Sequence, residues 1–354
     1  MTTWLALLGG FSVLVIEILG VHLLSPWFGN STIIWSQQIA IILLAMALGA
    51  WMGGNIAKSK QRLYSKLSLA LGAAAVFFVL LAFGIDLLAV AILPTELGLE
   101  QVAGLFQIGS FASAIIFFAP PVFFLAWITP LLVEIRVEAG ANAGQASGRL
   151  GAIATAGSLL GIYFSTFIAI PWLGVSASII VVAILLAGSA LVVSHRAKQL
   201  PLLAILFLFQ YLPQPSTTAH LPSGANVVES LRTPYQKLRI IEFEDGERWL
   251  QMNEGLDSFQ SKWLPGQQWP GGYYDLFALL PIYINYQSPR SSTTEYCILG
   301  YGAGSAVAPI AMGQGNDNWH LTGIELDPIV NELSNRHMPL SKDFNSKVAV
   351  WSSI

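Results

Sequence analysis

Residues 295–327 are EYCILGYGAGSAVAPIAMGQGNDNWHLTGIELD, and this stretch decides the fold of the C-terminal part of the chain. An apolar run at its start predicts a short strand, and a glycine-rich turn leads from there into a helix-compatible run over 306–312. A second strand, over 320–327, ends in acidic side chains. Strand, turn, helix and strand together predict the βαβ unit of a nucleotide-binding α/β fold.

The turn carries three glycines, Gly300, Gly302 and Gly304. Glycines let the backbone approach a ligand closely, and the helix that follows offers free N–H groups at its N-terminus. A dinucleotide site would have its third glycine at position 305, which is a serine, so the spacing favours an S-adenosyl ligand. Glu325, at the end of the second strand, is placed to accept hydrogen bonds from ribose hydroxyls.

The segment before this unit predicts a small antiparallel sheet. Residues 235–244 alternate in polarity, an Asp-Gly pair forms a hairpin turn, and residues 247–252 return. Residues 273–286 predict a helix that leads into the α/β unit. The predicted organisation is a linker over 213–224, a β-rich domain over 225–292 and a partial Rossmann-like S-adenosyl-binding domain over 293–354.

The composition of the whole chain is that of a membrane protein. Of its 354 residues, 54% are hydrophobic and 10% are charged, whereas about a quarter are charged in a soluble domain. About 20 apolar residues in a helix span the hydrocarbon core. Within a transmembrane domain over 1–212, six segments qualify: 4–24, 33–57, 67–93, 103–133, 150–170 and 174–194. A proline pair, Pro120 and Pro121, predicts a kink or break in the fourth.

Basic residues in the loops predict the orientation of these spans. The loops at 58–66, 134–149 and 195–199 carry Lys and Arg, whereas the loops between them carry none. The positive-inside rule puts the basic loops and the N-terminus in the cytoplasm, at a bacterial inner membrane. A further apolar run at 200–212 is short for a span. If it does not cross, the C-terminal part is cytoplasmic, as we expect from the supply of S-adenosyl metabolites; if it crosses, that part is external.

Glu17 is a carboxylate within the first predicted span. A lone acid at that depth costs several kcal/mol unless it is paired, neutralised or in contact with water. His22 and the pair Gln37–Gln38 are its candidate partners. One hypothesis is a site for an ion, a proton or a polar substrate, and the other is a protonated, hydrogen-bonded clamp between helices.

The composition of the C-terminal part limits its partners. Residues 225–354 hold 14 acidic and 9 basic side chains, which argues against nucleic acid, because phosphate binding needs clustered Lys and Arg. The one cysteine, Cys297, lies in an apolar run and is expected to be a buried, inert side chain. With no cluster of Cys and His, no metal site is predicted.

Several motifs together resemble the membrane-fused spermidine-synthase-like family. Residues 10–57, including Glu17, resemble its first two spans, and 144–174 resembles its later glycine-rich span. The Thr-Pro-Tyr-Gln run at 233–236 is similar to the family's entry strand, and the Tyr-Tyr-Asp run at 273–275 is similar to its Tyr-His-Glu segment. The resemblance covers nearly the whole chain.

The resemblance implies a cofactor, S-adenosylmethionine or its decarboxylated form, and a set of site residues. The implied cofactor-binding residues are Gln236, Gly300, Gly302, Gly304 and Glu325, and the residues on the substrate side are Tyr273 and Tyr274. Two positions depart from the family, since Ala303 stands where aminopropyltransferases carry an acid and Tyr274 stands where they carry a histidine. The family's catalytic Asp, the general base for the attacking amine, would lie beyond Ile354, so the resemblance is to a C-terminally truncated member.

Three functions stay open on this sequence. One is a degenerate family member that acts as a binding or accessory subunit of a membrane complex. Another is an active aminopropyl- or methyltransferase, and the third is a transporter of a polar or amine substrate. A parallel sheet with half its strands also leaves an uncovered face and an open edge near 348–351, which predicts completion by another chain or by a second copy.

Overall fold

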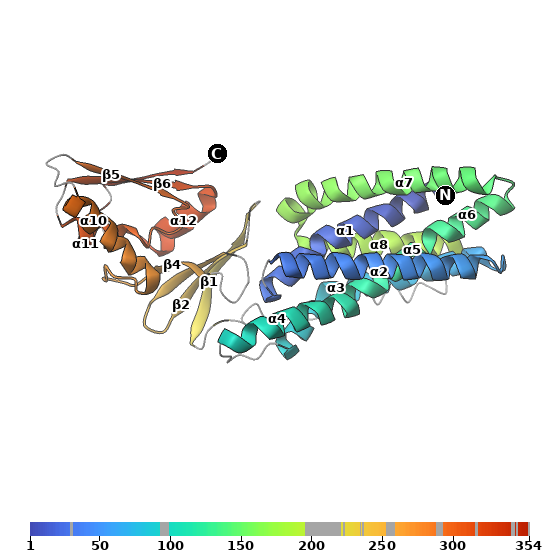
Figure 1. Ribbon diagram of the computed structural model, residues 1–354, viewed down its shortest axis with the longest axis horizontal. Helices are drawn as coiled ribbons and strands as arrows, with labels where there is room; N and C mark the ends of the chain where they lie inside the picture. Colours follow the sequence, from blue (N-terminus) through green and yellow to red (C-terminus); the bar gives the residue numbers. More distant parts are fainter. Residues whose placement is uncertain are drawn as a thin grey trace. The chain divides into compact units, whose positions relative to one another are not determined.

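The computed structural model describes residues 1–28, 31–92, 99–194, 221, 224–233, 235, 237–252, 259–287, 293–315, 318–340, 344 and 346–352. The chain forms two compact units, Met1–Ala219 and His220–Ile354. In its described part, the first unit is helical, and the second contains two β-sheets with helices (Figure 1). This confirms the coarse prediction of a helical membrane region followed by a mixed helix and sheet region.

The first unit is built from long apolar helices. They are α1 (Thr2–Phe28), α2 (Thr32–Ala57), α3 (Leu63–Ile92), α4 (Leu99–Ser113), α5 (Ala119–Ala126), α6 (Ile128–Glu138), α7 (Ala143–Phe164) and α8 (Val175–Ser194), with the π-helical segments η1 (Ala114–Phe118) and η2 (Ser165–Leu173). Six stretches of the described chain are long and apolar enough to span a membrane. The six predicted segments are therefore confirmed as helices of sufficient length and hydropathy to span, while the run at 200–212 lies outside the described residues.

The fourth span is broken near its proline pair, as predicted. The π-helical η1 ends at Phe118, Pro120 and Pro121 follow in the first turn of α5, and α5 gives way to α6 at Trp127. A proline ring removes an N–H donor and clashes with the carbonyl one turn earlier, so the preceding turn widens. Pro171 lies within η2, and this second widened segment was not predicted from the sequence.

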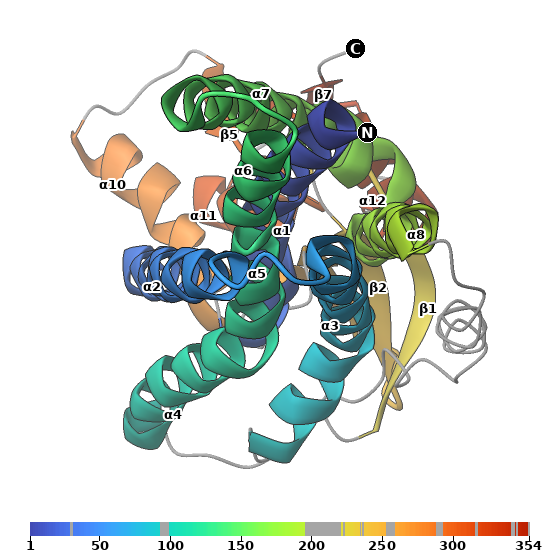
Figure 2. The same ribbon diagram turned by 90° about the vertical axis from the view of Figure 1, so that its right-hand side faces the viewer.

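Glycines let α1 and α7 pack closely. A Cβ atom on Gly157 would lie 2.0 Å from the carbonyl oxygen of Leu7, and one on Gly161 would lie 2.6 Å from that of Phe11. Because these neighbours are backbone atoms, a larger residue would force the helices apart. Gly151, in the same helix, has open space at that position. Figure 2 shows α1 and α7 side by side.

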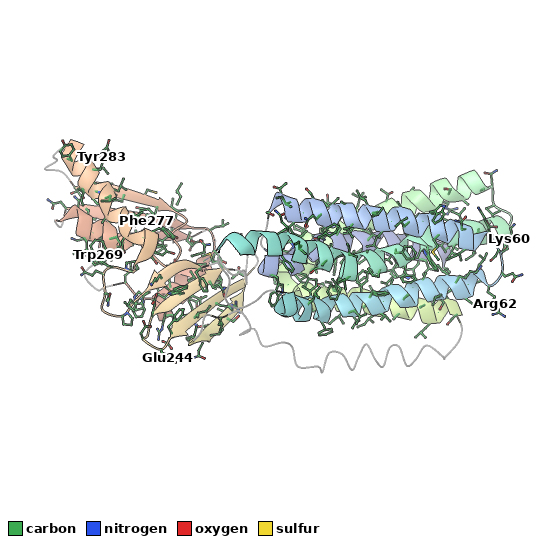
Figure 3. The ribbon with its side chains drawn as sticks, turned by 60° about the horizontal axis from the view of Figure 1, so that its bottom comes forward. Lys60, Arg62, Glu244, Trp269, Phe277 and Tyr283 are labelled. Carbon is green, nitrogen blue, oxygen red and sulfur yellow. The ribbon has the colours of Figure 1, made fainter. Side chains whose placement is uncertain are left out.

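Charged side chains mark one end of the first unit. Lys60, in the turn after α2, pairs with Glu134 of α6 at 3.3 Å. Two of the predicted cytoplasmic loops, 58–66 and 134–149, therefore begin at the same end of this unit. Figure 3 labels Lys60 and Arg62 there.

The second unit contains an antiparallel and a parallel sheet. The antiparallel sheet runs in the order β1 (Ala225–Arg232), β2 (Lys237–Phe243), β3 (Arg248–Met252), β4 (Phe259–Trp263), and the parallel sheet in the order β5 (Thr294–Leu299), β6 (Trp319–Glu325), β7 (Val348–Ser352). Its helices are the 3₁₀ segment η4 (Gly272–Ala278), α10 (Leu279–Gln287), α11 (Val307–Gln314) and α12 (Pro328–His337). The β2–β3 hairpin, β5, α11 and β6 confirm predicted elements, and β7 lies at the predicted open edge near 348–351, whereas the helix predicted over 273–286 begins as a 3₁₀ segment.

The parallel sheet is covered on one face only within the described residues. Successive strands are added in one direction, and because parallel crossovers are as a rule right-handed, those through α11 and α12 are expected to return on the same side. On the covered face, Tyr296 and Leu321 pack with Ile310 of α11. Cys297 points to the other face and is exposed, so its predicted burial is wrong. An apolar strand is buried on both sides only where both faces of the sheet are covered.

Candidate functional site

The predicted cofactor loop joins β5 to α11 at the carboxyl edge of the parallel sheet. Gly300, Gly302 and Gly304 have φ angles of 76°, 58° and 76°, in the left-handed region that favours glycine. A Cβ atom on Gly302 would lie 2.7 Å from Oγ of Ser261 in β4. The backbone path of the loop and the close approach of β4 therefore account for these glycines even without a ligand.

Glu325, the predicted ribose acid, lies directly beside this loop. Its Oε2 accepts a hydrogen bond from the Gly302 N–H at 2.8 Å, and its Oε1 accepts one from the Asp327 N–H at 3.2 Å. The side chain is buried, with 7% of its surface exposed. The structure thus brings the predicted acid and the predicted loop together, and it uses the carboxylate to hold the loop.

Strand β4 closes the loop from the side of the antiparallel sheet. Ser261 Oγ accepts a hydrogen bond from the Ala303 N–H at 2.9 Å. The Ser305 hydroxyl donates to the carbonyl of Lys262 and accepts from its N–H, each at 2.8 Å. Ala303 is buried in the apolar cluster that includes Val330 of α12. The side chain of Ala303 is therefore a methyl group packed in a core.

A second acid near the loop, Asp327, has a structural role. Its Oδ1 accepts from the Ile329 N–H at 3.1 Å and caps α12, and its Oδ2 accepts from the Thr233 hydroxyl at 2.6 Å. An Asp before a Pro at a helix start is a signal for this cap, but the contact with Thr233 is not visible in the sequence. The predicted cofactor residue Gln236, three positions after Thr233, lies outside the described residues.

Tyr301 fills the space beneath the loop. A Cβ atom on Gly323 of β6 would lie 2.3 Å from the Tyr301 ring, and one on Gly304 would lie 2.4 Å from its hydroxyl oxygen. The ring belongs to the core shared by the sheet and α11. Burial raises the pKa of the Tyr301 phenol above its ordinary value. The sequence does not indicate this role, because the packing of Tyr301 depends on the distant Gly323.

The opening beside the loop is small. Its lining includes Lys262, Trp263, Gln267, Ser305 and Phe344. Its volume is about 60 Å³, whereas sites for drug-sized ligands measure about 300–1,000 Å³. This opening is therefore too small for an S-adenosyl group.

The two predicted substrate-side tyrosines lie together in η4. The ring centroids of Tyr273 and Tyr274 are 4.1 Å apart and the rings are tilted. Burial, and then a hydrogen bond to Tyr273, raise the pKa of the Tyr274 phenol above its ordinary value. Among the residues that the structure describes, no hydrogen bond joins either tyrosine to the glycine loop.

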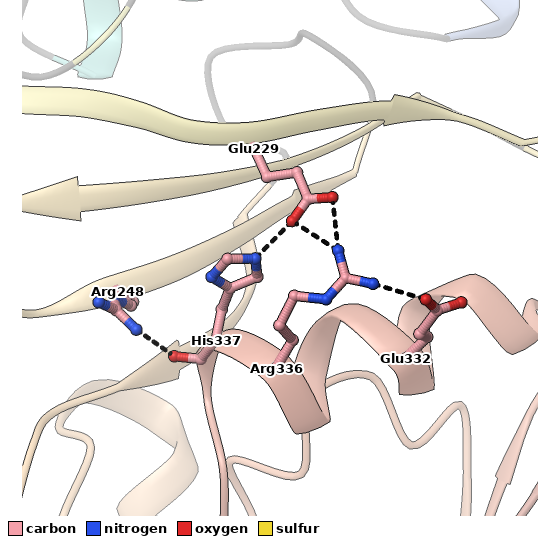
Figure 4. Close-up of polar contacts among 5 residues, drawn as sticks. All are labelled: Glu229, Arg248, Glu332, Arg336 and His337. Carbon is pink, nitrogen blue, oxygen red and sulfur yellow. Dashed lines mark hydrogen bonds and ion pairs between the residues drawn. The ribbon is translucent and has the colours of Figure 1, made fainter.

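A charged cluster that was not predicted joins β1 to α12 (Figure 4). Glu229 accepts hydrogen bonds from Arg336 Nη1 at 2.8 and 3.1 Å, and its Oε2 lies 2.5 Å from His337 Nε2. Arg336 also pairs with Glu332 at 2.6 Å, and Arg248 donates to the main-chain carbonyl of His337 at 2.8 Å. The hydrogen bond to His337, followed by Arg336, lowers the pKa of Glu229. These contacts fix α12 against β1.

In the first unit, Glu17 meets one of its candidate partners through the main chain. Gln38 Nε2 donates to the carbonyl oxygen of Glu17 at 3.0 Å, and Gln38 Oε1 is buried with no hydrogen-bond partner in the described structure. Within the described residues, no hydrogen bond reaches the Glu17 carboxylate. His22 is exposed, and its Nδ1 lies 3.1 Å from the carbonyl oxygen of Ile18. The predicted cluster around the carboxylate is therefore not assembled among these residues.

Grooves on the first unit are apolar, and no metal site is present in the described part of the chain. Two grooves of about 410 and 480 Å³ share Trp4 and Leu185 and are lined mainly by aliphatic and aromatic side chains. Such surfaces suit acyl chains better than amines.

Among the described residues, no group of three or more His, Cys, Asp or Glu side chains could hold a metal ion.

No protein-family model, curated protein or solved structure matches the chain.

Proposed function

We propose that the chain is a membrane-anchored, spermidine-synthase-like protein whose α/β unit is degenerate and acts as a binding or accessory module of a membrane complex. The parallel strands, the glycine loop and Glu325 support an S-adenosyl-type Rossmann-like fold for this unit. The basic residues near Lys60 support an orientation with this end in the cytoplasm, and we propose a bacterial inner membrane as the location. The observation that carries the proposal is the uncovered face of the parallel sheet.

That face carries large apolar side chains from all its strands. Leu299 of β5 is 78% exposed, Ile324 of β6 is 43% exposed and Trp351 of β7 is 69% exposed. Between them lies a polar pair, with His320 Nδ1 3.1 Å from Glu295 Oε1. Parallel sheets are ordinarily covered on both faces. Apolar anchors with interspersed polar groups are the composition of a protein interface, so we propose another chain or a second copy as the cover.

Contacts of the glycine loop support a module that does not catalyse transfer from an S-adenosyl donor. Glu325 and Ser261 already accept the N–H groups of Gly302 and Ala303, which a cofactor would otherwise approach. Ala303 supplies no carboxylate toward the amine of a bound S-adenosyl group, and residues 300–306 of the described loop contain no Asp or Glu that could act as a general base. These features favour a fold that is kept for its shape.

A native-gel measurement of the assembly tests the proposal. Full-length protein, solubilised gently from its own membranes, should migrate above the mass of one chain. Leu299→Glu should shift it toward that mass, because burial of the new carboxylate is costly. The matched control is Glu244→Lys, an exposed charge change in the β2–β3 turn. A wild-type protein that runs as a single chain, or a complex unaffected by Leu299→Glu, would contradict the proposal.

An active transferase is the alternative that the fold keeps open. Titration calorimetry of the folded, full-length protein with S-adenosylmethionine and with its decarboxylated form separates the two. Saturable heat that disappears in Glu325→Ala would favour the transferase, and no heat with either compound would favour the accessory module. Transport of a polar or amine substrate draws less support, because the grooves of the first unit are apolar.

A further inference from the structure

The segment formed by η4 and α10 exposes an unusual run of apolar and aromatic side chains. The exposed large side chains between 269 and 286 are Trp269, Tyr273, Leu276, Phe277, Leu279, Leu280, Ile282, Tyr283 and Tyr286. Tyr286 is 83% exposed, and Tyr283 and Leu276 are each 63% exposed. The stretch from Gly272 to Ile284 forms a short apolar helix. Figure 3 labels Trp269, Phe277 and Tyr283 along this surface.

The helix is fixed on the unit by its opposite side. Ala278 and Pro281 are buried, and Ile284 packs into the core beneath the parallel sheet. A Cβ atom on Gly313 of α11 would lie 2.1 Å from the carbonyl oxygen of Ala278, so the two helices approach backbone to backbone. This close contact holds the exposed side in one orientation.

Charge is nearly absent from this surface. Residues 270–287 contain one charged side chain, Asp275, and its Oδ1 accepts a hydrogen bond from the Gly271 N–H at 3.0 Å. The carboxylate is thereby tied back to the start of η4. A helix that is solvated on its outer side normally carries charged residues there, and a contiguous apolar surface of this kind marks an interaction site.

We propose that η4 and α10 lie in the headgroup region of the bilayer, with their exposed side turned toward the lipid. Leucine and isoleucine side chains suit the boundary of the acyl region, while the hydroxyls of Tyr283 and Tyr286 suit the level of the headgroups. The six spans keep this unit permanently tethered to a bilayer. Contact with lipid is therefore an intramolecular event at high effective concentration.

The uncovered sheet face of the same unit is less suited to lipid contact than the exposed side of η4 and α10. That face carries the pair Glu295 and His320 among its apolar residues, and inserting a carboxylate into lipid is costly. The exposed side of α10 carries no such group. The two apolar surfaces of the unit therefore suit different neighbours, lipid for α10 and protein for the sheet.

Site-directed fluorescence in lipid nanodiscs tests the proposal on the full-length protein. Cys297→Ser removes the one cysteine, and Tyr283→Cys or Leu280→Cys then places an environment-sensitive label on α10. The control is Glu244→Cys, exposed in the β2–β3 turn of the same unit. Each label is quenched once by iodide in water and once by lipids that carry a spin label just below the headgroup.

The α10 labels should be quenched several-fold more by the spin-labelled lipids than the control label, and several-fold less by iodide. Adding Leu276→Glu should move the Tyr283→Cys label toward the behaviour of the control. Labels on α10 that respond to iodide as the control does would overturn the proposal. Protection from iodide without lipid quenching would also overturn it, because it would show that protein covers this surface.

Discussion

Replacing Glu325 by glutamine should loosen the glycine loop. The carboxylate accepts N–H groups from Gly302 at 2.8 Å and from Asp327 at 3.2 Å while nearly fully buried. Glutamine keeps one acceptor oxygen and turns an NH₂ group toward the other donor. Hydrogen bonds to charged groups contribute about 1.5–3 kcal/mol each, so we expect Glu325→Gln to destabilise the loop by about 2 kcal/mol.

Hydrogen exchange of the full-length protein measures this change directly. Since 1.4 kcal/mol corresponds to a factor of ten, about 2 kcal/mol should speed exchange of the Gly302 amide by roughly 30-fold. Glu295→Gln is the matched control, because its carboxylate is exposed on β5 and surface ion pairs contribute little. Unchanged protection of Gly302 in Glu325→Gln would refute the inference that this carboxylate holds the loop.

Two further perturbations follow from the packing and the charges. The pKa of Glu229 is lowered from an ordinary value of 4.5, so the ionised carboxylate favours the folded state. Its contribution to the free energy of unfolding is complete above pH 4.5 and is lost as the pH falls through the lowered pKa. In acid titrations of stability, Glu229→Gln should therefore lose less stability below pH 4.5 than the wild type; an identical acid profile would contradict this. Gly157→Ala should destabilise the first unit by about 1–3 kcal/mol through overpacking against α1, measured by unfolding in mixed detergent. Gly151→Ala places its methyl group in open space and should not lower stability, because alanine is favoured over glycine in a helix interior by up to about 1 kcal/mol. Equal effects of the two alanines would count against the close α1–α7 contact.

Local patterns were sufficient to predict most elements of the fold. Runs of about 20 apolar residues identify spans because the bilayer fixes the length of a helix. The alternation before and after the Asp-Gly pair predicted the β2–β3 hairpin, the apolar run before the glycine turn predicted β5, and the run at 320–327 predicted β6. In each case the signal lies within one segment and needs no distant contact.

Features that depend on distant contacts could not be predicted. An uncovered sheet face was predicted, but the apolar run around Cys297 does not show which of its side chains point toward that face, so the exposure of Cys297 was predicted wrongly. The glycines and Glu325 were recognised as a site, but not that Glu325 would bind the loop itself, because that bond forms across 23 residues. Tyr301 beneath the loop and His337 beside Glu229 likewise gain their roles from residues far away in sequence.

Chemical labelling of Cys297 measures the cover of the uncovered sheet face most directly. This cysteine, the one in the chain, is exposed on that face near Leu299. If another chain covers this face, Cys297 should react slowly with a maleimide in permeabilised native membranes and fast once the protein is purified as a single chain. The control, Glu244→Cys in a Cys297→Ser background, should react fast in both preparations. Equal, fast labelling of Cys297 in membranes and in the purified chain would show that nothing covers this face and would contradict an assembly role.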